Sequence, residues 1–163
     1  MNEFEARNLV IPTIIGCTIT KVEDFGELYC VHFVNDEYFK SVELEDLKIG
    51  YGPSFVEKST GKIFSTGSGQ GAEFYVKAYK ESGNLYARPS NTIILNRLEN
   101  CSKNIGTLKI KSSLHVGLSQ AKAIYEALEN GKAFEFILPS EHEAEIAVSI
   151  LKAVGIFGKV LWK

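Results

Sequence analysis

Three histidines, three cysteines and a small acidic cluster are the side chains in this sequence that could do chemistry. His32, His115 and His142 are widely separated, and none forms an i, i+4 pair or a His-x-Glu pattern, or lies directly beside a cysteine. Metal ions are bound where several such ligands converge at short, regular spacings. The spacing of these histidines therefore predicts no metal site.

Cys17, Cys30 and Cys101 also lack metal-ligand spacing, and their number is odd. Unpaired cysteines are typical of a reducing cytosol, where thiols serve as small apolar side chains. The apolar run at 9–15 is short, contains Pro12 and follows two glutamates, so it does not predict a lipoprotein leader. No stretch approaches the roughly 20 apolar residues of a membrane span. We therefore expect a cytoplasmic protein with no membrane partner.

Gly67, Gly69 and Gly71 lie between a predicted strand and a predicted helix, where backbone N–H groups could bind a phosphate. A dinucleotide fingerprint needs the spacing G-x-G-x-x-G, and a P-loop ends in Gly-Lys-Ser/Thr, whereas Ala72 and Glu73 follow Gly71. No G-x-S-x-G nucleophile elbow is present either. We interpret this segment as a flexible loop, and we expect a protein with no cofactor and no catalytic site.

Glu43, Glu45 and Asp46 form an acidic cluster beside a sharp loop at residues 50–53. Paired carboxylates can do acid/base work, but a solvated loop is the simpler interpretation. If the cluster acts, complementing a basic partner requires less strict geometry than catalysis does. Tyr51 has glycine on both sides, so its ring is predicted to project as an interface anchor. These four residues are the predicted partner-binding site.

The composition is that of a folded globular protein, with 45% hydrophobic and 23% charged residues. Eighteen Lys and Arg against 20 Asp and Glu give a formal net charge of −2. A net charge so close to zero creates no field that attracts phosphate backbones, so nucleic acid is not an expected partner. A chain of 163 residues can form one domain or two small ones.

The elements that would position these residues begin with a short helix over residues 2–10, which Pro12 should end. A helix after Gly71 and an edge strand at 92–98 are predicted later in the first unit. Between them, Gly61 suits the positive φ of a hairpin turn. Runs of β-branched and aromatic residues predict strands at 18–22, 28–34, 38–42, 54–57 and 62–65.

The remaining residues alternate between strand and helix patterns and predict a second, βαβαβ unit. Ser119 and Ser140 stand where N-caps belong, and Gly131 and Gly155 stand where helices stop. The predicted domains are 1–103 and 104–163. The fold class is α+β, with an N-terminal antiparallel sheet and flanking helices followed by the small βαβαβ unit. Its strands are predicted at 108–111, 133–138 and 159–162, and its helices at 119–129 and 141–154.

The first unit carries two recognisable segments, Glu5-Ala6-Arg7-Asn8-Leu9 and Gly50-Tyr51-Gly52-Pro53-Ser54-Phe55-Val56-Glu57-Lys58-Ser59-Thr60-Gly61-Lys62. Over about residues 1–82 the chain resembles the bacterial immunity protein 35 family, which shares the glycine-x-glycine-proline turn and the threonine-glycine hairpin. The resemblance implies an inhibitor, encoded beside a polymorphic toxin, that neutralises the toxin by tight binding. It implies a cognate toxin as the partner and no catalytic residues.

The second unit carries Gly117-Leu118-Ser119-Gln120-Ala121-Lys122, Glu143-Ala144-Glu145, and an ending from Leu151-Lys152 through Gly155 to Val160. Over residues 107–163 it is similar to the C-terminal domain of the bacterial ribosomal stalk protein. This resemblance implies a shared fold, and it leaves a second interpretation open, a non-catalytic accessory module that binds ribosomal or translation components. The immunity interpretation is favoured because its resemblance covers more of the chain.

Overall fold

The structure, a computed structural model, describes all residues from Met1 to Lys163 and divides them into two compact units. Unit 1 is Met1–Tyr86 and unit 2 is Ala87–Lys163. Each unit has its own antiparallel sheet and its own hydrophobic core, so the predicted α+β class is confirmed. The boundary lies before residue 87 rather than near 103, because the strand predicted to close the first unit belongs to the second sheet.

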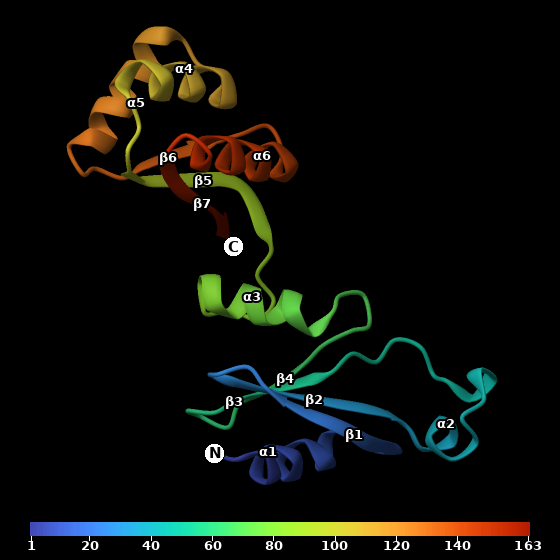
Figure 1. The fold of residues 1–163 in the computed structure, drawn as a ribbon. Helices are drawn as coiled ribbons and strands as arrows, with labels where there is room; N and C mark the ends of the chain where they lie inside the picture. The colour runs from blue at the N-terminus through green and yellow to red at the C-terminus, as the bar shows by residue number, and fades with distance from the viewer. The chain divides into compact units, whose positions relative to one another are not determined.

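The sheet of unit 1 has four antiparallel strands in the order β1-β2-β3-β4 (Figure 1). The strands predicted at 18–22 and 28–34 pair as a first hairpin, and the hairpin predicted around Gly61 is confirmed. Gly61 has a φ of 74°, the left-handed conformation that the turn of the second hairpin requires and that favours glycine. The strands are β1 (Cys17–Asp24), β2 (Leu28–Asn35), β3 (Ser54–Glu57) and β4 (Ile63–Ser65).

The first face of this sheet is covered by α1 (Glu3–Val10), which continues into a short 3-10 turn at Ile11–Thr13. A capping box starts the helix, because the Asn2 side chain accepts a bond from the Glu5 backbone N–H and the Glu5 carboxylate accepts one from Asn2. The helix buries Ala6 and Val10 against apolar side chains of the first three strands. This is the short leading helix that the sequence predicts.

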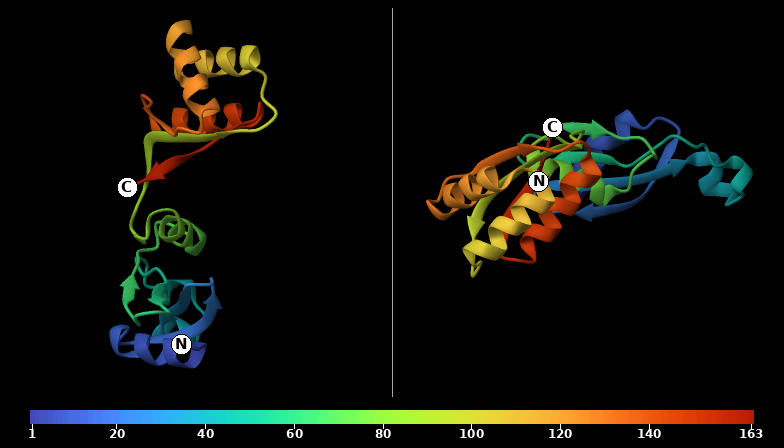
Figure 2. Two further views of the ribbon diagram at one scale, coloured as in Figure 1. Left: turned by 90° about the vertical axis from the view of Figure 1, so that its left-hand side faces the viewer. Right: turned by 90° about the horizontal axis from the view of Figure 1, so that it is seen from above.

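The opposite face is covered by α3 (Ala72–Ser82), as Figures 1 and 2 both show. Tyr75 and Val76 pack there against Cys30 of β2 and Phe55 of β3. Since α1 and α3 cover opposite faces, β2 is buried on both sides over its first half. A strand in that position has a continuous apolar run instead of a strict alternation.

The strand predicted at 38–42 is wrong, because α2 (Asp36–Ser41) and a 3-10 turn, η2 (Leu44–Asp46), occupy this stretch. Asp36 and Glu37 lie in the first turn of α2 and Lys40 in its last turn, which is the charge order that a helix dipole favours. Asp36 and Glu37, just before the predicted strand, are therefore the start of a helix. The third strand of the sheet is β3 instead.

The sheet of unit 2 has three antiparallel strands in the order β6-β5-β7. They are β5 (Pro89–Leu98), β6 (Phe134–Ile137) and β7 (Ile156–Trp162). The strand predicted at 92–98 as an edge strand is the central one, since β5 pairs with a neighbour on each side. Its residues Ile93 and Leu95 are fully buried.

Three helices lie on one side of this sheet in Figures 1 and 2: α4 (Lys103–Leu114), α5 (Leu118–Glu129) and α6 (Glu141–Lys152). The observed order is strand, helix, helix, strand, helix, strand, so the predicted βαβαβ order is wrong at its first element. Residues 108–111 alternate apolar and basic side chains, which is typical of a strand. In α4 the buried positions follow the helical period instead: Gly106, Thr107, Ile110, Ser113 and Leu114.

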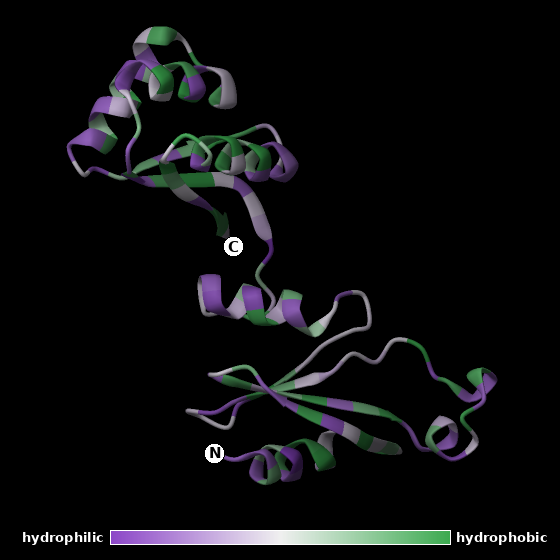
Figure 3. Ribbon diagram, in the orientation of Figure 1, coloured by the Kyte–Doolittle hydropathy of each residue, from purple (hydrophilic) through white to green (hydrophobic).

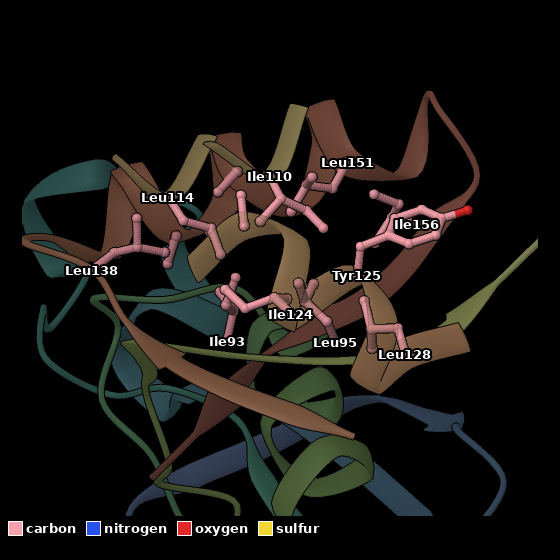
Figure 4. Close-up of a cluster of buried hydrophobic side chains, with 13 residues drawn as sticks. Ile93, Leu95, Ile110, Leu114, Ile124, Tyr125, Leu128, Leu138, Leu151 and Ile156 are labelled. Atoms are coloured by element: carbon pink, nitrogen blue, oxygen red, sulfur yellow. The ribbon is translucent and has the colours of Figure 1, made fainter. Parts of the chain in front are cut away.

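The core of unit 2 is formed between these helices and the sheet (Figure 4). Ile110 of α4 and Ile124 of α5 lie in one buried cluster with Ile93 and Leu95 of β5. Gly106 allows α4 and α5 to approach closely, since a Cβ there would lie 2.5 Å from the ring of Tyr125. Because small residues make this contact, α4 has a weak apolar stripe, which explains why the sequence pattern misses it.

The predicted N-cap at Ser140 is confirmed, because its hydroxyl oxygen accepts a hydrogen bond of 3.2 Å from the Glu143 backbone N–H at the start of α6. The predicted cap at Ser119 is wrong. Gly117 occupies the N-cap position of α5, and the helix begins at Leu118. Gly131 and Gly155 have φ values of 73° and 83° after their helices, as helix stops should.

Candidate protein-binding site

The four predicted site residues all lie in one stretch of unit 1 between β2 and β3. This stretch, residues 36–53, contains α2 and η2, and we call it the projecting segment. In Figure 1 it extends from one end of the sheet, away from the two faces that α1 and α3 cover. Every residue from 41 to 51 is exposed.

The projecting segment is anchored at both ends. Asn35 is only 4% exposed, and its amide donates a hydrogen bond of 2.8 Å to the carbonyl of Asp46 while accepting one of 3.1 Å from the N–H of Lys48. At the other end, Gly52 donates its N–H to the carbonyl of Thr66 at 3.0 Å. A Cβ on Gly52 would lie 2.3 Å from the carbonyl oxygen of Gly67, so only glycine fits there. These hydrogen bonds therefore fix the backbone of the segment in the conformation that exposes its side chains.

The projecting segment exposes an unusual density of large apolar side chains. Leu44 is 77% exposed and Ile49 is 89% exposed, although both are residue types that usually lie in a core. Single exposed apolar residues are ordinary, whereas several of them together on one surface are typical of interaction sites. Figure 3 shows hydrophobic (green) stretches along this segment, interrupted by hydrophilic (purple) ones. The full set is Phe39, Val42, Leu44, Leu47, Ile49 and Tyr51.

Carboxylates interrupt this apolar surface. Glu43, Glu45 and Asp46 are exposed, and no side-chain hydrogen bond or ion pair engages their carboxylates. Over the whole projecting segment, five acidic residues face two lysines, and Lys48 is already paired with Glu37 at 3.1 Å. The segment is therefore acidic as well as apolar, which fits a partner with basic groups around an apolar centre.

Tyr51 is 57% exposed, so it does not pack inside as a core residue. One edge of its ring contacts Phe33 at a centroid distance of 6.4 Å and an interplanar angle of 61°. The ring also lines a cavity of about 360 Å³, whose other walls include Ile14, Ile15 and Cys17. A ring held on one edge and exposed on its other side is available to a partner, and its role as an anchor stays a prediction.

Val42 ends α2 in the left-handed conformation, with a φ of 58°. A β-branched residue there is strained, and the left-handed conformation costs roughly 1–2 kcal/mol relative to the right-handed one. The side chain is 71% exposed, so burial within unit 1 offsets little of this cost. Strain of this kind is common where a side chain serves a binding site.

We expect the substitution Val42→Gly to raise the free energy of unfolding by about 0.5–1 kcal/mol, because glycine adopts the left-handed conformation without strain. Denaturant unfolding of the full chain measures this change. If Val42 contacts the partner, the same variant binds the partner more weakly. His115→Gly is the matched control, since His115 ends α4 at a φ of 53° in unit 2. It should raise stability without changing binding.

Another cavity lies in unit 2. Its volume is about 570 Å³, and Arg97, Cys101 and Tyr125 are among its walls. The Tyr125 hydroxyl is bound to the carbonyl of Cys101 at 2.7 Å, and burial raises the pKa of the Cys101 thiol. Arg97 is paired with Glu99 at 3.1 Å. These groups satisfy one another and do not form a nucleophile with a neighbouring base.

The glycine-rich loop before α3 serves a structural purpose in unit 1. The carbonyl of Gly67 lies against Gly52, and Gly71 occupies the N-cap position of α3. The expectation that this loop binds no nucleotide stays a prediction.

One cluster in the structure is not anticipated by the sequence analysis. Glu23, Cys30 and His32 offer three ligand atoms that all lie within 4.8 Å of one another. The signal was present in the pattern Cys30-Val31-His32, since alternate residues of a strand lie on the same face. Cys30 and His32 are two residues apart, a spacing that is neither i, i+4 nor adjacent, so it did not match the metal-ligand spacings considered above.

The fold and the site together define a class: a two-unit α+β protein that displays an anchored, apolar and acidic segment from its first unit. None of its helices is both long and apolar enough to cross a bilayer. No protein-family model matches the chain, and no significant match was found among curated proteins or solved structures.

Proposed function

We propose that this chain is an immunity protein that binds a cognate bacterial toxin and neutralises it by protein–protein contact through the projecting segment. The observation that carries the proposal is the combination of six exposed apolar side chains and three unengaged carboxylates on an anchored segment. The toxin as partner follows from the resemblance of residues 1–82 to the immunity family. The anchored segment supports a binding role independently of that resemblance.

The free energy of burying apolar surface favours a partner that covers the projecting segment. Burying apolar surface stabilises by roughly 25 cal/mol per Å², so covering Leu44 and Ile49 would contribute several kcal/mol. Because Asn35 and Gly52 hold the backbone, little conformational freedom is lost when the partner binds. A pre-organised segment is therefore suited to tight binding, and an inhibitor that acts by occupancy needs no catalytic group.

The test is co-expression of this chain with the toxin encoded beside it. Cells that produce both proteins should survive, and the two proteins should purify as a stoichiometric complex. Equal killing with and without this chain, together with no complex in a pull-down, would contradict the proposal.

The carboxylates are expected to control the speed of association. Changing Glu43, Glu45 and Asp46 together to Ser should slow toxin association about tenfold at low salt and flatten its salt dependence, because exposed charges steer encounter. Stopped-flow measurements over a range of ionic strength record both effects. A control that removes the same charge from unit 2, Glu129, Glu135 and Glu145 to Ser, should leave the salt dependence largely unchanged. If both triple variants slow association equally, the effect is one of net charge, and the segment loses its assigned role.

A further inference from the structure

The cluster of Glu23, Cys30 and His32 is built by the first hairpin of unit 1. Glu23 of β1 pairs directly with Cys30 of β2, and His32 lies two residues further along β2. Strand alternation therefore places all three side chains on one face of the sheet. The His32 Nε2 atom lies 2.7 Å from a Glu23 carboxylate oxygen and 3.3 Å from the Cys30 sulfur.

A thiol, an imidazole and a carboxylate could also form a nucleophilic triad, but this geometry excludes one. In a triad, one ring nitrogen takes the proton of the nucleophile and the other is held by the acid. Here the same nitrogen, Nε2, faces both Glu23 and Cys30. Cys30 is also fully buried, so its sulfur cannot reach a substrate. The three ligand atoms lie within 4.8 Å of one another, close enough to be shared by one ion.

We infer that Glu23, Cys30 and His32 form a binding site for a divalent transition-metal ion of the zinc type. Zinc is bound by thiolate, imidazole and carboxylate ligands, commonly with three from the protein and an open fourth position. The side chains of His32 and Glu23 are 33% and 31% exposed, so solvent can supply the fourth ligand. This site goes beyond the proposed toxin binding and does not depend on it. The proposed site departs from the prediction, based on the spacing of the histidines, that the chain has no metal site.

The distances agree with this assignment. Zinc–ligand lengths of about 2.0–2.3 Å in a tetrahedron place neighbouring ligand atoms about 3.3–3.6 Å apart. The observed N···S separation of 3.3 Å is within about 0.2 Å of the value for an imidazole and a thiolate, and the N···O separation of 2.7 Å must widen by about 0.6 Å. A rotation of the half-exposed Glu23 side chain achieves this without moving the backbone.

The charges agree as well. A thiolate and a carboxylate together balance the two positive charges of the ion, and a bound metal ion deprotonates a coordinating thiol. Lys21 holds the second oxygen of Glu23 at 2.6 Å. That contact orients the carboxylate from outside, as outer partners of metal ligands commonly do.

The experiment uses the full chain, reduced and freed of metal, titrated with Co²⁺ and then with Zn²⁺. We expect one Co²⁺ per chain with a thiolate-to-metal charge-transfer absorption, displacement of Co²⁺ by Zn²⁺, and a rise in Tm with Zn²⁺. His32→Gln and Glu23→Gln should each lower the Zn²⁺ affinity at least tenfold, and Cys30→Ser should abolish the absorption. Cys17→Ser and His142→Gln are the matched controls and should change neither the affinity nor the absorption.

Because Cys30 is buried, Cys30→Ser can unfold the chain. In that case the Zn²⁺ affinities of the His32→Gln and Glu23→Gln variants test the inference. Circular dichroism of His32→Gln and Glu23→Gln checks that both remain folded. The inference is overturned if the reduced chain binds no Zn²⁺ at micromolar free ion, or if folded His32→Gln binds it as tightly as the wild type. Neither outcome touches toxin binding, which the co-expression test measures separately.

Discussion

Replacing Tyr51 by alanine is expected to weaken binding of the proposed toxin partner by about 2 kcal/mol, roughly 30-fold in Kd, while the chain stays folded. The ring is 57% exposed, so its loss removes little of the core of unit 1. A buried aromatic truncated to alanine would instead cost about 3–5 kcal/mol of folding free energy. Isothermal titration calorimetry gives the affinity, and denaturant unfolding gives the stability.

Tyr86 supplies a matched control within the same unit. It is 50% exposed and contacts Phe64 edge-on at a centroid distance of 6.2 Å, much as Tyr51 contacts Phe33. Tyr86→Ala should leave toxin affinity unchanged. If a folded Tyr51→Ala variant binds the toxin as tightly as Tyr86→Ala does, Tyr51 is not the anchor.

Replacing Phe55 by alanine is expected to destabilise unit 1 by about 3–5 kcal/mol. Phe55 is fully buried in β3, where it pairs with Cys30 of β2 and Phe64 of β4, and its ring lies 5.8 Å from that of Tyr75. The substitution leaves a cavity between the sheet and α3. Hydrogen exchange of the full chain measures the effect separately in each unit.

Because each buried cluster lies within one unit, amides of β2 should lose protection in Phe55→Ala while amides of β5 keep it. Ile124→Ala, at a fully packed position in the core of unit 2, should give the reverse pattern. Equal loss of protection in both units in either variant would show that they unfold as a single cooperative body, contrary to this prediction.

Strong local patterns predict most of unit 1. The hairpin of β1 and β2 and the hairpin of β3 and β4 follow from β-branched runs and from turn glycines such as Gly61. The strand prediction for residues 38–42 is wrong because two signals compete there. The aromatic pair and the valine at 42 have strand propensity, whereas Asp36 and Glu37 favour the start of a helix. In a helix of six residues, both signals are short and neither dominates.

Unit 2 is harder to predict where small residues make the contacts. The buried face of helix α4 includes the small or polar residues Gly106, Thr107 and Ser113. Its apolar residues Ile105 and Leu108 are exposed to solvent. A pattern search that counts apolar residues therefore selects the wrong face. The boundary error has a different cause: β5 pairs with β6 and β7, which lie far along the chain, and this long-range pairing has no local sequence signal.

The candidate site also has features that the sequence predicts and features that it does not. The exposure of Tyr51 follows from its glycine neighbours, and the acidic residues are visible in the sequence. The anchor at Asn35 and the apolar exposure of Leu44 and Ile49 depend on where the backbone goes after β2. Glu23 joins Cys30 and His32 through strand register, which spacing along the chain does not encode.

The most direct measurement of the central claim is the binding of the purified chain to the proposed cognate toxin, in an inactive form, by isothermal titration calorimetry. The account predicts a stoichiometric complex, and a loss of affinity of 100-fold or more in the double variant Leu44→Ser, Tyr51→Ala, since each removes an exposed apolar contact. The contradicting result is a folded double variant that binds as tightly as the wild type. So is a wild-type chain that binds no toxin and instead associates with ribosomes.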